Sequence, residues 1–301
     1  MLPASGCVRE YNEDHLFSIS SPIPLMLNAD LHCHSNVSDG MLAPHELAAR
    51  AKRGGVELWA LTDHDEVSGI ADARKAATDL NLKFVAGVEI SITWGGKTVH
   101  IVGLAIDENN ADLCEGLKSV RGGRERRARE IAEQLAQSGV PGAYEGALRF
   151  ADNPDMVGRT HFARFLVEAG VRASVSDVFA SYLVEGKPGF VPHRWATLEQ
   201  ATGWIRGAGG RAVIAHPGRY AFTEMQLDAL ISAFRELGGE GIEVVTGSHA
   251  PHQYDSFARV ARQAGLLASR GSDFHGPAES RADLGTLPPL PAGLTPVWHD
   301  W

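Results

Sequence analysis

The sequence contains little cysteine and no long apolar run. Only three of its 301 residues are cysteines, Cys7, Cys33 and Cys114. Their odd number and wide spacing favour a reducing compartment over a framework of disulfide bonds. No stretch approaches the roughly 18 apolar residues that a membrane helix needs. We therefore expect a cytoplasmic protein that does not cross a membrane.

Positive charge is also scarce. The chain has 28 Lys and Arg residues against 37 Asp and Glu residues, a net charge of -9 at pH 7. Such a chain cannot coat nucleic acid through its overall charge, so any contact with a polyanion must be local. Hydrophobic residues make up 44% of the sequence, which is enough for a substantial core. No feature indicates an obligate protein partner.

The first 25 residues do not resemble an export signal. They contain acidic residues and prolines where a signal peptide has a basic start and an apolar middle. Met26 opens the segment MLNADLHCH. We interpret residues 1–25 as an N-terminal extension and expect that translation can begin at Met26.

Short apolar segments alternate with amphipathic helical patterns through most of the chain. Near-continuous apolar strands separated by helices indicate a parallel sheet covered by helices, and seven strands indicate a barrel. Residues 106–192 contain few strand signals, so we predict a mostly helical insertion over the barrel mouth, between barrel parts 26–105 and 193–301. The expected strands are residues 26–31, 57–62, 83–90, 98–104, 212–216, 241–245 and 265–273.

Histidine and carboxylate side chains recur where these strands end. In the segment ADLHCHSNVSDG, His32 and His34 would share one face of a strand while Cys33 turns away. A His-x-His pair alone is a weak indication of metal binding. Seven further histidine and carboxylate residues are candidates. All of them except His100, which is in mid-strand, lie near the C-terminal ends of strands, where barrels place their active sites. The other candidates are Asp39, His64, Glu89, His100, His216, Asp273 and His275.

This set of side chains predicts a metal centre. A structural role is the commoner explanation for any single histidine. Nine such groups at one rim would be costly to bury unless a cation paired with them. Nitrogen and carboxylate donors without thiolates suit Mn²⁺, Zn²⁺ or Fe²⁺. We therefore predict a multinuclear metal hydrolase.

Six motifs resemble, in order, those of the polymerase and histidinol phosphatase (PHP) superfamily: DLHCHSNVSDG, LTDHD, GVEIS, HIVGL, AHPGR and GSDFH, over about residues 28–277. The resemblance implies an α/β fold, a distorted (β/α)7 barrel that holds three divalent metal ions, and we favour Mn²⁺ over Zn²⁺ or Fe²⁺. The implied ligand sets are His32, His34, Glu89 and Asp273 for one metal; Glu89, His100 and His216 for a second; Asp39, His64 and His275 for a third.

Within the superfamily, the chain most closely resembles the group that removes the 3′-phosphate from nucleoside 3′,5′-bisphosphates. The resemblance implies a phosphoric monoester hydrolase that converts adenosine 3′,5′-bisphosphate to AMP and phosphate with a metal-activated hydroxide. The first alternative is a 5′-3′ exonuclease that uses the same site on short RNA or oligonucleotides. A histidinol phosphate phosphatase and a non-catalytic nucleotide-binding module rank below it.

Three further residues are candidates for catalysis. His193, where the insertion rejoins the barrel, is the first candidate for the general acid, and an incidental loop histidine is the alternative. His249, near another strand end, ranks second. Asp65 and Asp63 flank His64 and could orient ligand imidazoles, although capping of the next helix explains them equally well.

A second substrate phosphate would require cations outside the metal cluster. Residues 118–140 contain six Lys or Arg residues against three Glu, although a solvated helix face is the ordinary explanation. The start of a predicted helix favours phosphate, and Thr160 there could instead be only its N-cap. Phe190, Trp195 or Tyr220 could stack on a base or belong to ordinary packing. The candidate phosphate contacts are Arg159, Thr160, His161, Lys187 and Arg219.

Overall fold

The computed structural model describes residues 27–301, so the predicted extension of residues 1–25 and Cys7 lie outside the described part of the chain. Seven strands form one sheet in sequence order, and all seven lie where the sequence predicted them. The strands are β1 (Ala29–Asp30), β2 (Leu58–Leu61), β3 (Lys83–Trp94), β4 (Lys97–Leu104), β5 (Arg211–Ile214), β6 (Gly241–Thr246) and β7 (Leu267–Gly271).

The prediction of a wholly parallel sheet was wrong at β4. This strand runs antiparallel to both β3 and β5, whereas the other neighbours are parallel. The cause is a two-residue turn at Gly95 and Gly96, whose φ angles are 55° and 76°. Glycine adopts positive φ without steric cost, and such turns join antiparallel strands. β3 and β4 therefore form a hairpin with no helix between them.

Contacts between the first and last strands close the barrel. The Leu31 amide donates to the Arg270 carbonyl at 3.0 Å, and Cys33 forms an isolated parallel bridge with Phe274. The segments that follow β1 and β7 consequently lie side by side. The two ends of the PHP-like motif series, 240 residues apart at His32 and Ser272, are thus neighbours.

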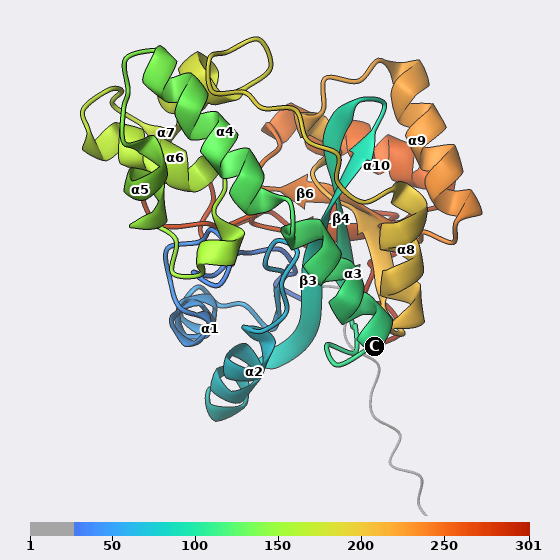
Figure 1. Ribbon diagram of the computed structural model, residues 1–301. Helices are drawn as coiled ribbons and strands as arrows, with labels where there is room; N and C mark the ends of the chain where they lie inside the picture. The colour runs from blue at the N-terminus through green and yellow to red at the C-terminus, as the bar shows by residue number, and fades with distance from the viewer. Residues whose placement is uncertain (1–26) are drawn as a thin grey trace, which may run out of the picture.

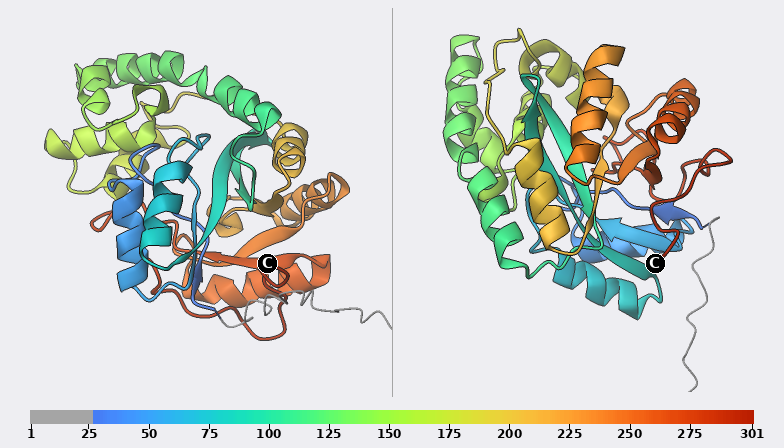
Figure 2. Two further views of the ribbon diagram at one scale, coloured as in Figure 1. Left: turned by 90° about the horizontal axis from the view of Figure 1, so that it is seen from below. Right: turned by 90° about the vertical axis from the view of Figure 1, so that its right-hand side faces the viewer.

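Six helices cover the outside of the barrel (Figure 2). Their buried faces include Leu117 in α3, Ile205 in α8 and Phe234 in α9, which join one core with the strands. In the part of the chain that the structure describes, no helix combines the length and the apolar character needed to cross a bilayer. The six helices are α1 (Pro44–Arg53), α2 (Ile70–Asp79), α3 (Ala111–Arg121), α8 (Leu198–Gly207), α9 (Glu224–Glu236) and α10 (Pro251–Ala264).

A separate group of helices, the helical unit, lies together above α1 and α2 in Figure 1. It has its own core, which includes Ile131, Phe162 and Leu183. The residue range of the predicted insertion stays a prediction, and because α3 packs in the barrel core, the packing favours a start near Arg124. The unit consists of α4 (Arg124–Gln137), α5 (Ala143–Leu148), η1 (Pro154–Met156), α6 (Arg159–Glu168), α7 (Val175–Val178) and η2 (Phe179–Leu183).

Candidate metal centre

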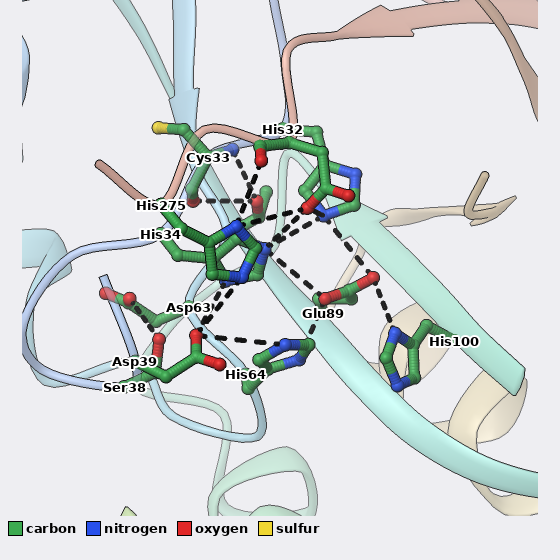
Figure 3. Close-up of polar contacts among 12 residues, drawn as sticks. His32, Cys33, His34, Ser38, Asp39, Asp63, His64, Glu89, His100 and His275 are labelled. Atoms are coloured by element: carbon green, nitrogen blue, oxygen red, sulfur yellow. Dashed lines mark hydrogen bonds and ion pairs between the residues drawn. The ribbon is translucent and has the colours of Figure 1, made fainter. Parts of the chain in front are cut away.

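The structure brings all nine predicted ligands to one end of the barrel, and most are seen in Figure 3. Their donor atoms form four overlapping groups, and within each group all donors lie within 4.8 Å of one another. The groups are His34, Asp39, His64 and His275; His32, Glu89 and His216; His32, His34 and Asp273; His64, Glu89 and His100.

Glu89 lies at the middle of the cluster and is fully buried. Its Oε1 atom is 2.9 Å from His216 Nε2, 3.0 Å from His100 Nδ1 and 3.3 Å from His32 Nε2. Its Oε2 atom is 2.8 Å from His64 Nδ1. Burial alone would raise the pKa of this carboxyl, but the surrounding imidazoles hold it well below its usual value. An ionised carboxylate therefore joins ligands from four parts of the chain.

The β3–β4 hairpin explains why His100 belongs to the cluster although it is in mid-strand. β3 continues beyond Glu89 to Trp94, and His100 on the returning strand is paired with Ser91. The hairpin therefore extends past the ends of the shorter strands. This extension places the His100 imidazole beside Glu89 (Figure 3).

Cys33 is not part of the centre. Its thiol lies 3.3 Å from the Ala60 carbonyl and accepts a hydrogen bond from Trp59 Nε1 at 3.2 Å. It faces the outer layer of the barrel, as the alternation of side chains along a strand predicted. The donor set of the cluster is therefore imidazole and carboxylate only.

The cluster fits divalent cations. Within residues 27–301, six of its side chains carry a buried nitrogen or oxygen atom that has no hydrogen-bond partner. The His64 Nδ1 and Glu89 Oε2 atoms among them are close but are not aligned as a hydrogen bond. Each buried polar atom without a partner costs about 1–3 kcal/mol, and cation binding would remove this cost. The six atoms are His34 Nδ1, Asp39 Oδ1, His64 Nδ1, Glu89 Oε2, His216 Nδ1 and Asp273 Oδ1.

Protonation of the imidazoles differs across the cluster. Burial lowers the pKa of His34 and of His216 to about 3, so both are neutral at pH 7 and keep a lone pair for a cation. Burial also acts to lower the pKa of His275, but the neighbouring Asp39 carboxylate outweighs it and raises this pKa to about 9. A cation that binds His275 below that pH must displace a proton.

We expect Mn²⁺ binding to release protons and to tighten as the pH rises. Because His275 is protonated below about pH 9 in the metal-free protein, the apparent affinity should increase from about pH 6 to about pH 9. Calorimetric titration in two buffers with different protonation enthalpies measures the number of protons released. An affinity independent of pH, without proton release, would contradict this account of His275.

Asp63 and Asp65 accept hydrogen bonds from the backbone amides and hydroxyl groups of nearby serines. Asp63 accepts hydrogen bonds from Ser35 N at 2.7 Å, Ser35 Oγ at 2.6 Å and Ser38 Oγ at 2.6 Å, which orders the loop before Asp39. Asp65 accepts from Ser91 N at 2.7 Å and Ser91 Oγ at 2.9 Å. Among the described residues, neither carboxylate contacts an imidazole, so the predicted orienting role finds no contact in the structure.

The two candidates for the general acid, His193 and His249, make contacts that stabilise the fold. His249 Nε2 accepts the Gly218 amide at 2.9 Å, and its Nδ1 lies 3.2 Å from the Val244 carbonyl, so both ring nitrogens are engaged. The His193 ring packs 4.2 Å from Trp195. Burial is the main cause that lowers the pKa of each histidine to about 4. Both are neutral at pH 7, which does not favour the predicted role of proton donor.

The predicted phosphate contacts separate into two groups. Arg159, Thr160 and Arg219 line a cavity beside the metal cluster, whereas Lys187 is exposed outside that lining. Thr160 Oγ1 donates to Asp39 Oδ2 at 2.8 Å and thus positions a predicted ligand; the N-cap of α6 is Gly158. The prediction that His161 contacts phosphate conflicts with its burial, because its Nδ1 accepts the Gly158 amide at 3.0 Å and closes the helix end.

The aromatic candidates are also divided. Trp195 lines the cavity. The Tyr220 hydroxyl accepts the His100 amide at 2.8 Å and supports the hairpin. Phe190 is partly buried outside the cavity lining. These contacts favour packing for Tyr220 and Phe190, which was the ordinary alternative for all three.

The cavity lies between the barrel and the helical unit. Its volume is about 340 Å³. The metal cluster forms one part of its wall through side chains such as His64 and Asp273, and the helical unit forms another through Arg124, Arg127 and Phe179. Any molecule in this cavity would therefore contact both parts.

The sequence indicates only that the range 118–140 is basic and does not separate Arg124 and Arg127 from their neighbours. They are 8% and 6% exposed, and their guanidinium carbons lie 4.8 Å and 5.3 Å from the Trp195 ring. By contrast, Arg126 is solvated and pairs with Glu130. The spacing along the helix is the sequence signal for their burial, because Arg124 and Arg127 lie on the same helix face as Ala128 and Ile131.

Comparisons with known proteins agree with the resemblance that the sequence motifs indicated. Residues 30–183 match the model of the PHP domain family. The 3′,5′-nucleoside bisphosphate phosphatase of Chromobacterium violaceum is 50% identical over 275 residues, which cover 91% of this chain and 96% of the relative. The 5′-3′ exoribonuclease Rnm of Escherichia coli is 45% identical over 274 residues, covering 90% and 93%. The solved structure of an amidohydrolase from Chromobacterium violaceum superposes with a TM-score of 0.88 at 50% identity, covering 90% of this chain and 94% of that one.

Proposed function

Because this chain belongs to the PHP domain family, we propose that it is a metal-dependent phosphatase that removes the 3′-phosphate from nucleoside 3′,5′-bisphosphates. The observation that carries the proposal is the cavity, which has a metal-binding cluster at one wall and buried arginines at another. The metal-binding cluster suits hydrolysis of one phosphate, and the arginines suit binding of another.

Three divalent ions would account for the donor set, and Mn²⁺ is the ion we favour. When bound, such ions supply a hydroxide nucleophile at neutral pH and offset charge on phosphate oxygens. One group of donors, Asp39, His64 and His275 with His34 beside them, agrees with the third ligand set that the resemblance implies. The donor groups divide the remaining two sets differently, because His216 groups with His32 and Glu89, whereas His100 groups with His64 and Glu89.

The arginines of the cavity wall, of which Arg127 is buried and Arg159 partly buried, favour a second phosphate on the substrate. Burial, reinforced by Arg159 and Arg124, lowers the pKa of Arg127 to about 9. Burial, reinforced by Arg219 and Arg124, lowers the pKa of Arg159 to about 10. Among the described residues, Arg124 is paired with Asp65, but Arg127 and Arg159 form no ion pair with a carboxylate. Buried charge of one sign is stabilised by an anion, and guanidinium groups match the oxygens of phosphate.

Arg219 is placed to contact the phosphate that reacts. Its Nη1 atom lies 3.3 Å from Asp273 Oδ2, and the side chain lines the cavity next to the cluster. A guanidinium there can hold oxygens whose charge increases in the transition state. The bond that breaks is between phosphorus and the ribose 3′-oxygen, and water supplies the oxygen of the released phosphate.

The similarity to an exoribonuclease supports a second candidate function. Release of a 5′-nucleotide from the 5′ end of RNA breaks the same bond, and the phosphate then stays on the rest of the RNA. The two activities therefore differ only in whether the reacting phosphate carries a further chain. A cavity of about 340 Å³ is near the lower end of the usual range for ligand pockets and favours the mononucleotide.

A substrate comparison tests the proposal. With Mn²⁺ present, adenosine 3′,5′-bisphosphate should be converted to AMP and phosphate, with a higher kcat/KM than a 5′-phosphorylated tetranucleotide. Phosphate assay and chromatography of the nucleotide products measure both reactions. The absence of phosphate release beside an active control phosphatase would refute the phosphatase proposal, and a higher kcat/KM for the tetranucleotide would favour the exonuclease.

A further inference from the structure

Strand β6 contains a buried carboxylate that is outside all the predicted ligand motifs. Glu243 lies in the sequence GIEVVT between Ile242 and Val244 and is 1% exposed. A lone carboxylate in an apolar barrel strand is costly unless both of its oxygens have partners. The partners of Glu243 are two ligands of the candidate metal centre.

Each carboxylate oxygen of Glu243 forms a hydrogen bond with a different histidine. Its Oε1 atom is 2.8 Å from His32 Nδ1, and its Oε2 atom accepts the backbone amide of His216 at 2.6 Å. His32 follows β1 and His216 follows β5. On the other edge of its ring, His32 Nε2 is 3.3 Å from Glu89 Oε1, at the centre of the cluster. Glu243 therefore lies behind His32, on the side away from the donor atoms.

The backbone of both Glu243 and His216 is irregular. Glu243 is paired with Ser269 on β7, but the next paired residue is Val245 with Arg270, so Val244 is an extra residue and forms a β-bulge. Bulges redirect side chains and are frequent beside active sites. His216 has φ of 26° and ψ of 59°, which is unfavourable for a residue other than glycine. Such a conformation persists only where neighbouring groups hold it, as Glu243 Oε2 does here.

We propose that Glu243 is a positioning residue for the metal centre. Its carboxylate keeps the proton of His32 on Nδ1, so that Nε2 presents its lone pair to a cation. The same carboxylate holds the His216 turn at the distance from Glu89 that the cluster requires. This inference rests on the metal binding in the proposed function and does not depend on which phosphate ester is the substrate.

The test is Mn²⁺ binding by the full chain carrying Glu243→Gln. Glutamine keeps the side-chain volume, but its amide offers one accepting oxygen in place of two, so it can accept a hydrogen bond from only one of the two histidines. We expect the dissociation constant for Mn²⁺, measured by equilibrium dialysis with metal analysis, to rise about 10–100-fold. The absorption spectrum of the Co²⁺-loaded variant should change as well, because the orientation of His32 changes. Circular dichroism of the metal-free variant checks that it is folded.

Two comparisons separate positioning from a general structural effect. Glu240→Gln is the matched control, because Glu240 pairs with Arg211 at the surface near the start of the same strand. In a chain that carries His32→Ala, Glu243→Gln should weaken Mn²⁺ binding less than in the wild type, since one of its two targets is gone. If Glu243→Gln does not fold, Glu243→Asp, which keeps both oxygens but shortens the reach, is measured by the same criteria.

An unchanged Mn²⁺ affinity in the folded variant would overturn the proposal. A loss of affinity that is equally large with and without His32→Ala would overturn it too. Failure of the proposed reaction gives a different result: the wild type would bind Mn²⁺ and release no phosphate, while Glu243→Gln would still bind Mn²⁺ more weakly.

Discussion

Replacing Glu89 by glutamine is expected to abolish turnover and most metal binding. The two oxygens of this buried carboxylate lie within 3.0 Å of three imidazoles from three strands or strand ends, His64, His100 and His216. Glutamine has nearly the same shape but lacks the charge and one accepting oxygen. We expect the phosphate-release rate to fall by at least about 10³-fold, the scale of removing a principal electrostatic contribution.

Metal analysis after dialysis against dilute Mn²⁺ and single-turnover assays measure the two effects of Glu89→Gln. Glu236→Gln, an exposed residue in α9, is the control with the same change of chemistry. If Glu89→Gln kept the metal content and the rate of the wild type, Glu89 could not be a central ligand. The assignment of the cluster would then be wrong.

Replacing Arg127 by methionine should impair the reaction only for substrates that carry a second phosphate. Arg127 is anchored through Nε to the Val191 carbonyl at 3.1 Å, and its buried guanidinium lines the cavity. A hydrogen bond to a charged group contributes about 1.5–3 kcal/mol. We therefore expect kcat/KM for adenosine 3′,5′-bisphosphate to fall by roughly 10–100-fold, while kcat/KM for 3′-AMP stays within about twofold of the wild type.

The neighbouring arginine provides the control for Arg127. Arg126 lies on the solvated face of the same helix and pairs with Glu130, so Arg126→Met should leave both substrates unaffected. The informative quantity is the ratio of kcat/KM for the two substrates. Equal losses on both substrates in Arg127→Met would place the effect on the fold or the metal cluster, and would contradict a second phosphate at this position.

The sequence was sufficient to predict that the nine candidate ligands come together, because their signal is periodic. His32 and His34 have the spacing of one strand face, and most of the other ligands follow an apolar strand, so the barrel rim alone brings them together. The direction of β4 was missed although the sequence carries a signal for it. Apolar alternation is the same in parallel and antiparallel strands, but a Gly-Gly pair between two strand segments, here Gly95 and Gly96, is typical of a hairpin turn.

Burial separates residues of the same type that the sequence alone does not distinguish. Arg124 and Arg126 are of the same type and two positions apart, yet one is buried in the cavity wall and the other is solvated. His161 has the position of an anion ligand at a helix start, but its ring closes the helix instead. Which way such a side chain faces depends on the packing of α4 and α6, which involves contacts distant in sequence.

The separate hydrophobic core of the helical unit has a consequence for how substrate range can evolve. All nine candidate ligands belong to the barrel, whereas Arg124, Arg127 and Arg159 belong to the helical unit between β4 and β5. Substitutions within that unit that spare its contacts with Asp39 and Asp65 change its own core and its side of the cavity, and leave the ligand-bearing strands untouched. A lineage of such proteins can therefore acquire new substrates by replacing one continuous segment, while the chemistry of bond cleavage is inherited unchanged.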